Sequence, residues 1–273
     1  MRVRKRSLPS GWYPGSASQA EESIRRMARS IPLPGRGGCA GIAPHAGWEF
    51  SGSLALRVLS CIATGMDTIV IIGGHLASTD GIMLYGAEAF DTPLGLLESD
   101  TELAQSLREA TGATETDDAD NTVEIQLPLL KFAAPKARVV GMRAPPSSRA
   151  EHLGECIADS AARLGRKVGV LGSTDLTHYG PGYGFTPAGG EAVAWVRDVN
   201  DRRFIDAALA MDIPSVLERS RRERSACSAG GAVAAISFAR AHGVSGGTLL
   251  DYRTSYEIHP SESFVGYAAI LFS

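Results

Sequence analysis

Two continuously apolar runs constrain the fold of this chain most strongly, one within DTIVIIGGH (67–75) and one within KVGVLGSTD (167–175). A strand that faces solvent on one side alternates apolar and polar residues, but these runs do not alternate. They therefore predict strands that are buried on both faces, as in a sheet covered by helices on both sides. Four further β-rich runs are CAGIAPH (39–45), ARVVGMR (137–143), GTLLDYRTS (247–255) and SFVGYAAILF (263–272).

Segments with helical patterns lie between these runs, so strands and helices alternate along the chain. This order predicts a layered α/β fold. We expect four helices. The first is capped by Ser51 or Ser53, has Leu54, Val58, Leu59 and Ile62 on one face and ends just before Gly65, and the second begins at the capping box SDTE (99–102) and ends near Gly112. The third carries the apolar stripe Leu153, Ile157 and Leu164, and the fourth runs from about Ser228 to His242 and is closed by Gly243. No repeat or long linker divides the sequence, so we expect one domain over residues 1–273.

Composition excludes several classes of protein. The net charge of −3 gives no broad basic surface for nucleic acid or anionic lipid. The basic start MRVRKR is not followed by the apolar region of a signal peptide, and no apolar stretch is long enough to cross a bilayer. The four cysteines have no CxxC spacing and are too few for a disulfide scaffold. We therefore expect a cytoplasmic protein without nucleic-acid or membrane partners.

Three of the six histidines follow predicted strands directly. His45 follows the first run, His75 the second and His178 the fourth. A single histidine at the start of a loop is usually solvated or bonded to nearby backbone. However, ligand clefts in open α/β sheets lie at the carboxyl ends of the strands, so three histidines at equivalent positions indicate a site. Imidazole is the commonest protein ligand for zinc, copper and iron, which predicts a metal centre.

The identity of the third ligand stays open from the residues alone. Two histidines and one anionic ligand would leave positions free for substrate, and Asp175, Glu124 and the Cys227 thiolate are the candidates. Cys227 opens CSAGGAVAA, where a position near a helix N-terminus would lower the pKa of its thiol. No compact motif such as HExxH supports the set.

Two carboxylates have both a catalytic and a structural interpretation. Glu124 lies in the otherwise apolar segment DNTVEIQLPLL (120–130), where it could orient a ligand histidine or take a proton, or simply be paired. Asp175 could orient His178 as an acid or base, or cap a turn. GPGYG (180–184) lacks the residues of a phosphate-binding loop, so we expect a mobile loop beside the site. The charged stretch ERSRRERS (218–225) is expected to be a solvated face.

Several segments, in this order, resemble the MEMO-like family, which includes the AmmeMemoRadiSam system protein B group. They are SGWYPGS (10–16), PHAGWEFSG (44–52), DNTVEIQLPLL, GSTDLTHYG (172–180), ACSAGGAVAA (226–235) and VGYAAILF (265–272). The resemblance covers nearly the whole chain. It implies a three-layer α/β/α fold with a central mixed sheet, like that of the class III extradiol dioxygenases, which hold non-haem iron with two histidines and a carboxylate.

The resemblance also implies roles for individual residues. His45, His75 and Cys227 would bind the metal, with Cys227 in place of the dioxygenase carboxylate, and Asp175 with His178 would be the acid/base pair. Three departures from the family pattern lie near the site. Asn121 replaces a histidine, Gly73-Gly74 precedes His75 without the usual proline, and Trp48 replaces a tyrosine.

The residues and the resemblance together favour an oxidoreductase that binds iron or copper. His178, Asp175 and Glu124 are the expected catalytic residues, and Asn121, Trp48 and Tyr179 are expected to bind substrate. A small organic molecule or O₂ would occupy the open positions of the metal. The alternatives are a zinc-dependent hydrolase with the same ligands and a non-catalytic scaffold whose cleft binds a peptide or partner. Family association adds AMMECR1-like and radical SAM proteins as expected partners.

Overall fold

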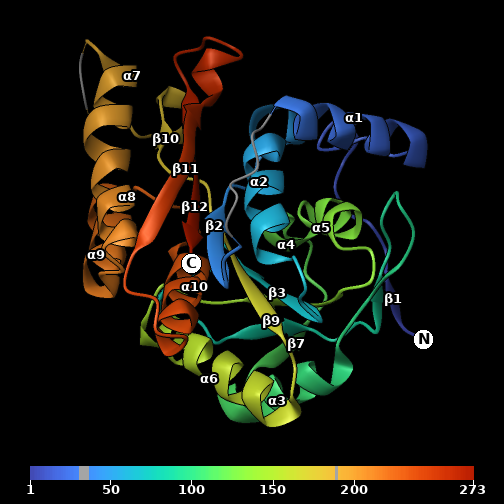
Figure 1. Ribbon diagram of the computed structural model, residues 1–273. Helices are drawn as coiled ribbons and strands as arrows, with labels where there is room; N and C mark the ends of the chain where they lie inside the picture. Colours follow the sequence, from blue (N-terminus) through green and yellow to red (C-terminus); the bar gives the residue numbers. More distant parts are fainter. Residues whose placement is uncertain (31–36, 188–189) are drawn as a thin grey trace.

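The computed structural model describes residues 1–30, 37–187 and 190–273, and a nine-stranded mixed sheet lies at its centre (Figure 1). In spatial order its strands are β10 (His178–Tyr179), β12 (Phe264–Phe272), β2 (Ala40–Ala43), β9 (Val168–Ser173), β3 (Thr68–Gly73), β8 (Arg138–Arg143), β4 (Met83–Tyr85) and β7 (Thr114–Thr116), with β11 (Gly247–Thr254) also paired to β12. The four central strands β2, β9, β3 and β8 are parallel, and β12 and β4 join them antiparallel on either side. A smaller sheet contains β1 (Val3–Arg4), β5 (Ala89–Phe90) and β6 (Leu97–Glu98).

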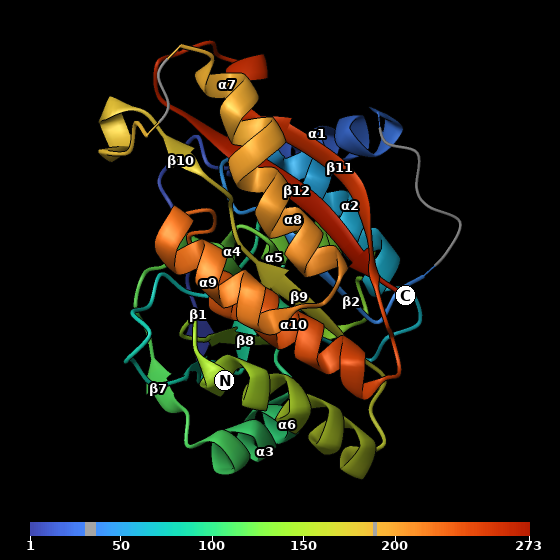
Figure 2. The same ribbon diagram turned by 90° about the vertical axis from the view of Figure 1, so that its left-hand side faces the viewer.

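Helices cover both faces of the large sheet. One layer contains α1 (Ala17–Ser30), α2 (Ser53–Ile62), α4 (Asn121–Glu124) and α5 (Leu127–Ala133), and the other contains α3 (Thr101–Thr111), α6 (Ser148–Leu164) and α10 (Ala229–Ala241). The second layer is extended along β11 and β12 by α7 (Ala192–Trp195), α8 (Asp201–Leu209) and α9 (Ile213–Glu223) (Figure 2). The fold is thus a three-layer α/β/α sandwich, as the resemblance implied.

The alternation of side chains along β3 shows why its sequence is apolar throughout. Ile69 and Ile71 belong to the core beneath α1, α2 and α5, whereas Val70 and Ile72 belong to the core beneath α6 and α10. All six residues of β3 and all six of β9 are buried. The continuous apolar sequence of these two strands therefore reflects burial on both faces. All six predicted strands are confirmed, as β2, β3, β8, β9, β11 and β12.

Two predicted helix starts are wrong in detail. The Ser51 hydroxyl donates to the carbonyl of Ala46, a short π-helical turn (Trp48–Gly52) leads into α2, and no side chain caps that helix. At the second start Asp100, not Ser99, is the N-cap, because its carboxylate accepts from the Leu103 amide. The Ser99 hydroxyl has no hydrogen-bond partner among the described residues. In both places tertiary contacts selected a different residue from the one that the local pattern favoured.

Other predicted boundaries agree with the structure. Helix α3 ends at Gly112 in a left-handed conformation, and α10 runs from Ala229 to Ala241 with Ser228 as its N-cap residue. The charged stretch 218–225 contains the last turns of α9 and is a solvated face as predicted, since Ser225 alone among these eight residues is buried. Across the described parts of the chain, no helix is both long enough and apolar enough to span a membrane.

Helix α10 approaches the sheet unusually closely through two glycines. A Cβ atom on Gly231 would lie 2.2 Å from the carbonyl oxygen of Ile72 in β3, and one on Gly230 would lie 2.1 Å from that of Ala144. On the sheet side, a Cβ atom on Gly172 in β9 would meet the Gly231 carbonyl oxygen at 2.5 Å. Because backbone atoms cannot move aside as a flexible side chain can, only glycine fits at these positions.

We expect Gly231→Ala to destabilise the protein by roughly 2–3 kcal/mol, because the added methyl group forces α10 away from the sheet. Urea unfolding followed by circular dichroism measures this change. Gly81→Ala is the matched control, since a Cβ atom added there would meet no heavy atom within 4 Å and the φ of Gly81 is not positive. Equal unfolding midpoints for the two variants would contradict the close contact.

Candidate metal centre

Side chains from four separate segments meet at the carboxyl edge of the parallel strands. His45 lies two residues after β2, His75 two residues after β3 and Asp175 two residues after β9, and Cys227 lies just before α10. The carboxyl ends of parallel strands share one edge, so residues that are far apart in sequence come together there. The backbone amide of Cys227 donates to the carbonyl of Asp175 at 3.2 Å, which ties the start of α10 to the end of β9.

The geometry of this group fits a metal ion. One potential ligand atom from each of His45, His75 and Cys227 lies within 4.8 Å of the others. The Nε2 atom of His45 is 3.3 Å from Cys227 Sγ, and the two imidazole rings meet edge to face with centroids 5.1 Å apart. Metal–nitrogen bonds of about 2.0 Å and metal–sulfur bonds of about 2.3 Å imply a nitrogen–sulfur separation of roughly 3.5 Å in a tetrahedral site. His45 Nε2 and Cys227 Sγ thus already stand at about coordinating distance, and His75 lies near them.

A hydrogen-bond chain fixes the tautomer of His45. The Ser173 hydroxyl donates to the carbonyl of Thr122 at 2.6 Å, so it can only accept from the two other groups near it. These groups are Gln126 Nε2 at 3.2 Å and His45 Nδ1 at 3.3 Å. His45 must therefore carry its proton on Nδ1, which leaves Nε2 unprotonated, so that its lone pair can accept from the Cys227 thiol or bind a metal.

His75 is oriented in the same way by a carboxylate. Its Nδ1 lies 3.3 Å from Asp120 Oδ2, so Nδ1–H donates and Nε2 is free. Asp120 also accepts from the amide and hydroxyl of Thr122 and pairs with Arg143 at 3.4 Å. Although burial acts to raise it, the hydrogen bonds from His75 and Thr122 hold the pKa of Asp120 well below its usual range. Asp120 thus stays ionised, as the carboxylate of a carboxylate–histidine–metal arrangement must.

Burial favours the neutral form of both the His45 imidazole and the Cys227 thiol. Burial, with the neighbouring His75 as a second cause, lowers the pKa of His45 to about 3, so this imidazole is neutral at physiological pH. Burial also raises the pKa of the Cys227 thiol, and the nearby Asp175 adds to this effect. The expected lowering of this pKa is therefore wrong, because burial outweighs the hydrogen bonds to the backbone and to Thr174 that act to lower it. A metal ion at this site would itself have to favour the thiolate.

Asp175 and His178 lie together, but not as the predicted hydrogen-bonded pair. Asp175 Oδ1 accepts from the backbone amide of His45 at 2.6 Å, and the His178 ring donates from Nδ1 to the carbonyl of Leu176 at 3.0 Å. Burial raises the pKa of Asp175 and lowers that of His178, and the attraction between the two groups opposes both effects. Leu176 thus orients the imidazole, whereas Asp175 acts on it through its charge.

Tyr183 is a neighbour of this pair that sequence reasoning missed. Its ring lies edge to face with His178 at 4.9 Å between centroids. It belongs to the GPGYG segment, which lies beside the site as expected and forms a short 3₁₀ turn, Pro181–Tyr183. The amide of Gly182 donates to the Ser263 hydroxyl at 2.9 Å, which anchors this turn to the segment before β12.

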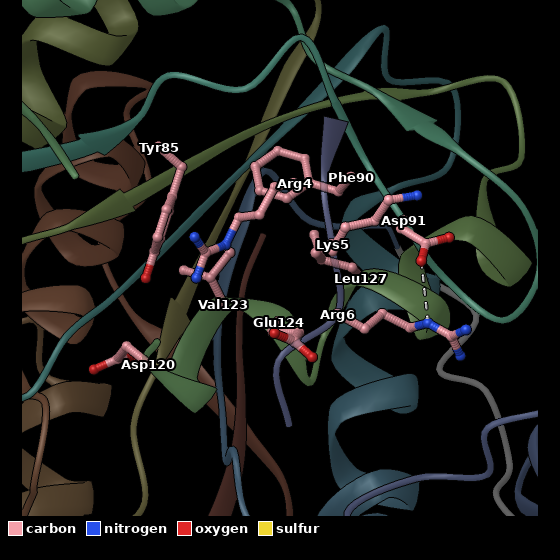
Figure 3. Close-up of a pocket in the computed structure, with 10 residues that line it drawn as sticks. All are labelled: Arg4, Lys5, Arg6, Tyr85, Phe90, Asp91, Asp120, Val123, Glu124 and Leu127. Atoms are coloured by element: carbon pink, nitrogen blue, oxygen red, sulfur yellow. Dashed lines mark hydrogen bonds and ion pairs between the residues drawn. The ribbon is translucent and has the colours of Figure 1, made fainter. Parts of the chain in front are cut away.

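Glu124 is a paired carboxylate rather than a partner of a ligand histidine. It accepts from the amide and hydroxyl of Ser7, from the Leu8 amide and from the Tyr13 hydroxyl. No hydrogen bond joins it to a histidine in the described ranges. Glu124 and Asp120 line a small cavity together with Arg4 and Tyr85 (Figure 3). Its volume of about 10 Å³ leaves room for about one water molecule. Glu124 therefore anchors the N-terminal segment.

The three predicted substrate-binding residues have mainly structural contacts. Asn121 donates from Nδ2 to the carbonyl of His45 at 3.0 Å and so holds the ligand loop. Trp48 is buried, donates from Nε1 to the carbonyl of Ile125 at 3.2 Å and packs against Tyr13. Tyr179 stacks on Phe264 at 5.2 Å between centroids, within a small apolar cluster. Trp48 and Tyr179 thus lie in packed surroundings, and their contact with a substrate stays a prediction.

Ser173 and Asp120 also escaped prediction, and of the two only Ser173 carried a usable signal. Ser173 is the last residue of a buried strand, where a hydroxyl needs a partner. Asp120 precedes a short helix and caps it by accepting from the Thr122 amide, and this local explanation hides its second bond to His75. Both residues bind the Nδ1 side of a histidine, opposite the nitrogen that would face a metal. The sequence spacing of the histidines does not reveal these hydrogen-bond partners.

Comparison with known proteins identifies similar chains over the full length. The profile of the family described as Memo-like protein matches residues 4–271. A MEMO1 family protein of Thermococcus onnurineus (strain NA1) is 32% identical over 289 residues, which cover 99% of each chain. One from Thermococcus kodakarensis is 32% identical with the same coverage, and one from Pyrococcus abyssi is 34% identical over 85% of this chain and 86% of its own.

Glu124→Gln should reduce the free energy of unfolding by roughly 1–3 kcal/mol, because an amide nitrogen would replace one of the two acceptor oxygens that four donors share. Urea unfolding measures this loss, and Glu22→Gln on the exposed face of α1 is the control. Metal content should not change, since Glu124 does not touch the ligands. Loss of metal from a fully folded Glu124→Gln variant would instead place this carboxylate in the centre.

Asp120→Asn should lower metal affinity by about 10- to 100-fold, the range seen when a partner of a ligand histidine is removed. An asparagine has only one acceptor oxygen and carries no charge, so it cannot accept from Thr122 as well as from His75 and Arg143, and the His75 ring loses its ionised, fixed partner. Competition with a chromogenic chelator measures the affinity. Asp118→Asn is a matched control, because Asp118 also pairs with Arg143 at 3.0 Å but is largely exposed. Equal affinities in both variants would contradict the role of Asp120.

Proposed function

This chain belongs to the Memo-like protein family, and on that premise we propose that it is a metal-dependent oxidoreductase that binds iron or copper. The convergence of His45, His75 and Cys227 is the observation that carries the proposal. Each histidine has its Nδ1 proton engaged and its Nε2 lone pair free, which is the state that a metal ligand needs.

The donor set favours a redox-active metal. A thiolate is a softer ligand than the carboxylate of a two-histidine, one-carboxylate centre, and soft ligands favour copper or tune the potential of iron. Three protein ligands leave coordination positions free for a small substrate. A bound iron or copper ion would supply Lewis acidity and one-electron chemistry at those positions.

His178 is the residue best placed to move a proton. Its Nδ1–H is held by the carbonyl of Leu176, so the other ring nitrogen, Nε2, is the atom that can accept and return a proton. The buried Asp175 stabilises the charged imidazolium through space, because the two groups attract each other. The ring of Tyr183 covers one side of the imidazole and would limit the access of water to it.

We expect protein purified without chelator to contain about one iron or copper ion per chain, the stoichiometry of a single three-ligand site. Cys227→Ala should lower this content severalfold, as measured by plasma mass spectrometry. Cys39→Ala is the matched control, because Cys39 is also a free, partly buried cysteine but lies at the start of β2.

The outcomes separate three functions. Iron or copper that depends on Cys227 supports the oxidoreductase. Zinc as the only metal, identified by anomalous scattering at its absorption edge in crystals, would overturn it in favour of hydrolysis by a metal-bound water. A protein that takes up no metal, or whose metal content is unchanged in Cys227→Ala, would overturn the metal centre and leave a binding scaffold.

A further inference from the structure

A groove of about 680 Å³ opens beside the candidate metal centre. It is lined by Cys227 and by Leu76, the residue that follows His75. The side chain of His75 is 44% exposed, whereas that of His45 is only 2% exposed. The groove thus reaches the centre at Cys227, and His75 is the more exposed of the two histidines, so a molecule in the groove can contact the cysteine of the centre.

The walls of the groove are mixed, and several elements contribute apolar residues to them. Helix α9 supplies Pro214 and Leu217, the segment before α10 supplies Ala226, and Leu76 and Pro146 lie on loops that follow β3 and β8. Surfaces of this kind hold an apolar body by excluding water from it. The groove also contains charged side chains, and all of them come from α9.

The charges along α9 leave one cation available. Arg222 pairs with Glu218 at 3.1 Å, which neutralises both. Arg221 also lines the groove, is exposed, and has no ion pair or hydrogen bond within residues 1–30, 37–187 and 190–273. Another nearby arginine, Arg149, already donates to the carbonyls of Thr79 and Asp80. Arg221 is therefore the cation that can receive an anionic group in this groove.

We propose that the groove binds a small organic anion, with its charged group on Arg221, its apolar body against Leu217 and Pro214, and its far end at the metal centre. The guanidinium group offers two parallel N–H donors that match the oxygens of a carboxylate or a phosphate. This inference rests on the proposed function, because it names the substrate class of the same site. Carboxylates and phosphates share the required chemistry, and separate probes distinguish them.

The test uses the full chain and three aromatic probes that differ in their polar group. Benzoate and phenyl phosphate carry an anion, and benzamide is a neutral analogue of similar shape. Dissociation constants are measured by saturation-transfer NMR. We expect at least one anion to bind more tightly than benzamide, and Arg221→Gln to weaken its binding about tenfold, the loss of one charge-assisted contact. The binding of benzamide should not change.

Arg29→Gln is the matched control. Arg29 lies in the last turn of α1, as Arg221 lies in the last turn of α9, and it is exposed. It should leave all three affinities unchanged, and the metal content of Arg221→Gln should equal that of the wild type. Thermal unfolding of each variant confirms that it is folded.

Two results would overturn the anion site. The first is equal affinity for the anions and benzamide, and the second is an anion affinity in folded Arg221→Gln that matches the wild type. Weakening by Arg29→Gln to the same extent would also overturn it, because the effect would then be one of net charge. A protein that lacks metal but still binds benzoate through Arg221 would overturn the proposed function and leave the anion site standing.

Discussion

Backbone contact between α10 and the strands β3 and β9 is the constraint on which the candidate centre depends. Gly231 and Gly172 allow the helix and the sheet to touch without side chains between them. The Ser228 hydroxyl then reaches the carbonyl of Gly74 at 3.0 Å, one residue before His75. Because Cys227 precedes Ser228 directly, this contact delivers its sulfur to the strand ends. A wider spacing would separate the cysteine from both histidines.

A metal centre also needs histidines with fixed orientations, and buried polar groups hydrogen-bonded to the imidazoles fix them here. Ser173 and Asp120 receive the Nδ1 protons of His45 and His75, and each is itself held by Thr122. The short helix α4 therefore determines the tautomers of two ligands from different strands. Buried polar groups are costly when unpaired, so such a network stabilises one arrangement of the ligands over others.

Glu124 and Cys227 show how little the sequence says about the partners of a single residue. An isolated acid in an apolar segment must be paired, but the sequence does not say with what. Its donors come from Ser7, Leu8 and Tyr13, more than a hundred positions away. On the residues alone Cys227 is one of three open candidates for the third ligand, and the family resemblance favours it. In the folded chain its sulfur lies 3.3 Å from His45 Nε2, whereas Asp175 is engaged with the His45 backbone.

The sequence by itself determined the strands, the layered α/β class and the histidines at the strand ends. These features follow from local patterns, since burial on both faces requires apolar residues throughout and parallel strands place their carboxyl ends along one edge. Only the tertiary structure decided which nitrogen of each histidine is unprotonated, that burial raises the pKa of the Cys227 thiol, and that Arg221 and Cys227 line one groove. These properties depend on distances between residues that are far apart along the chain, and packing sets those distances.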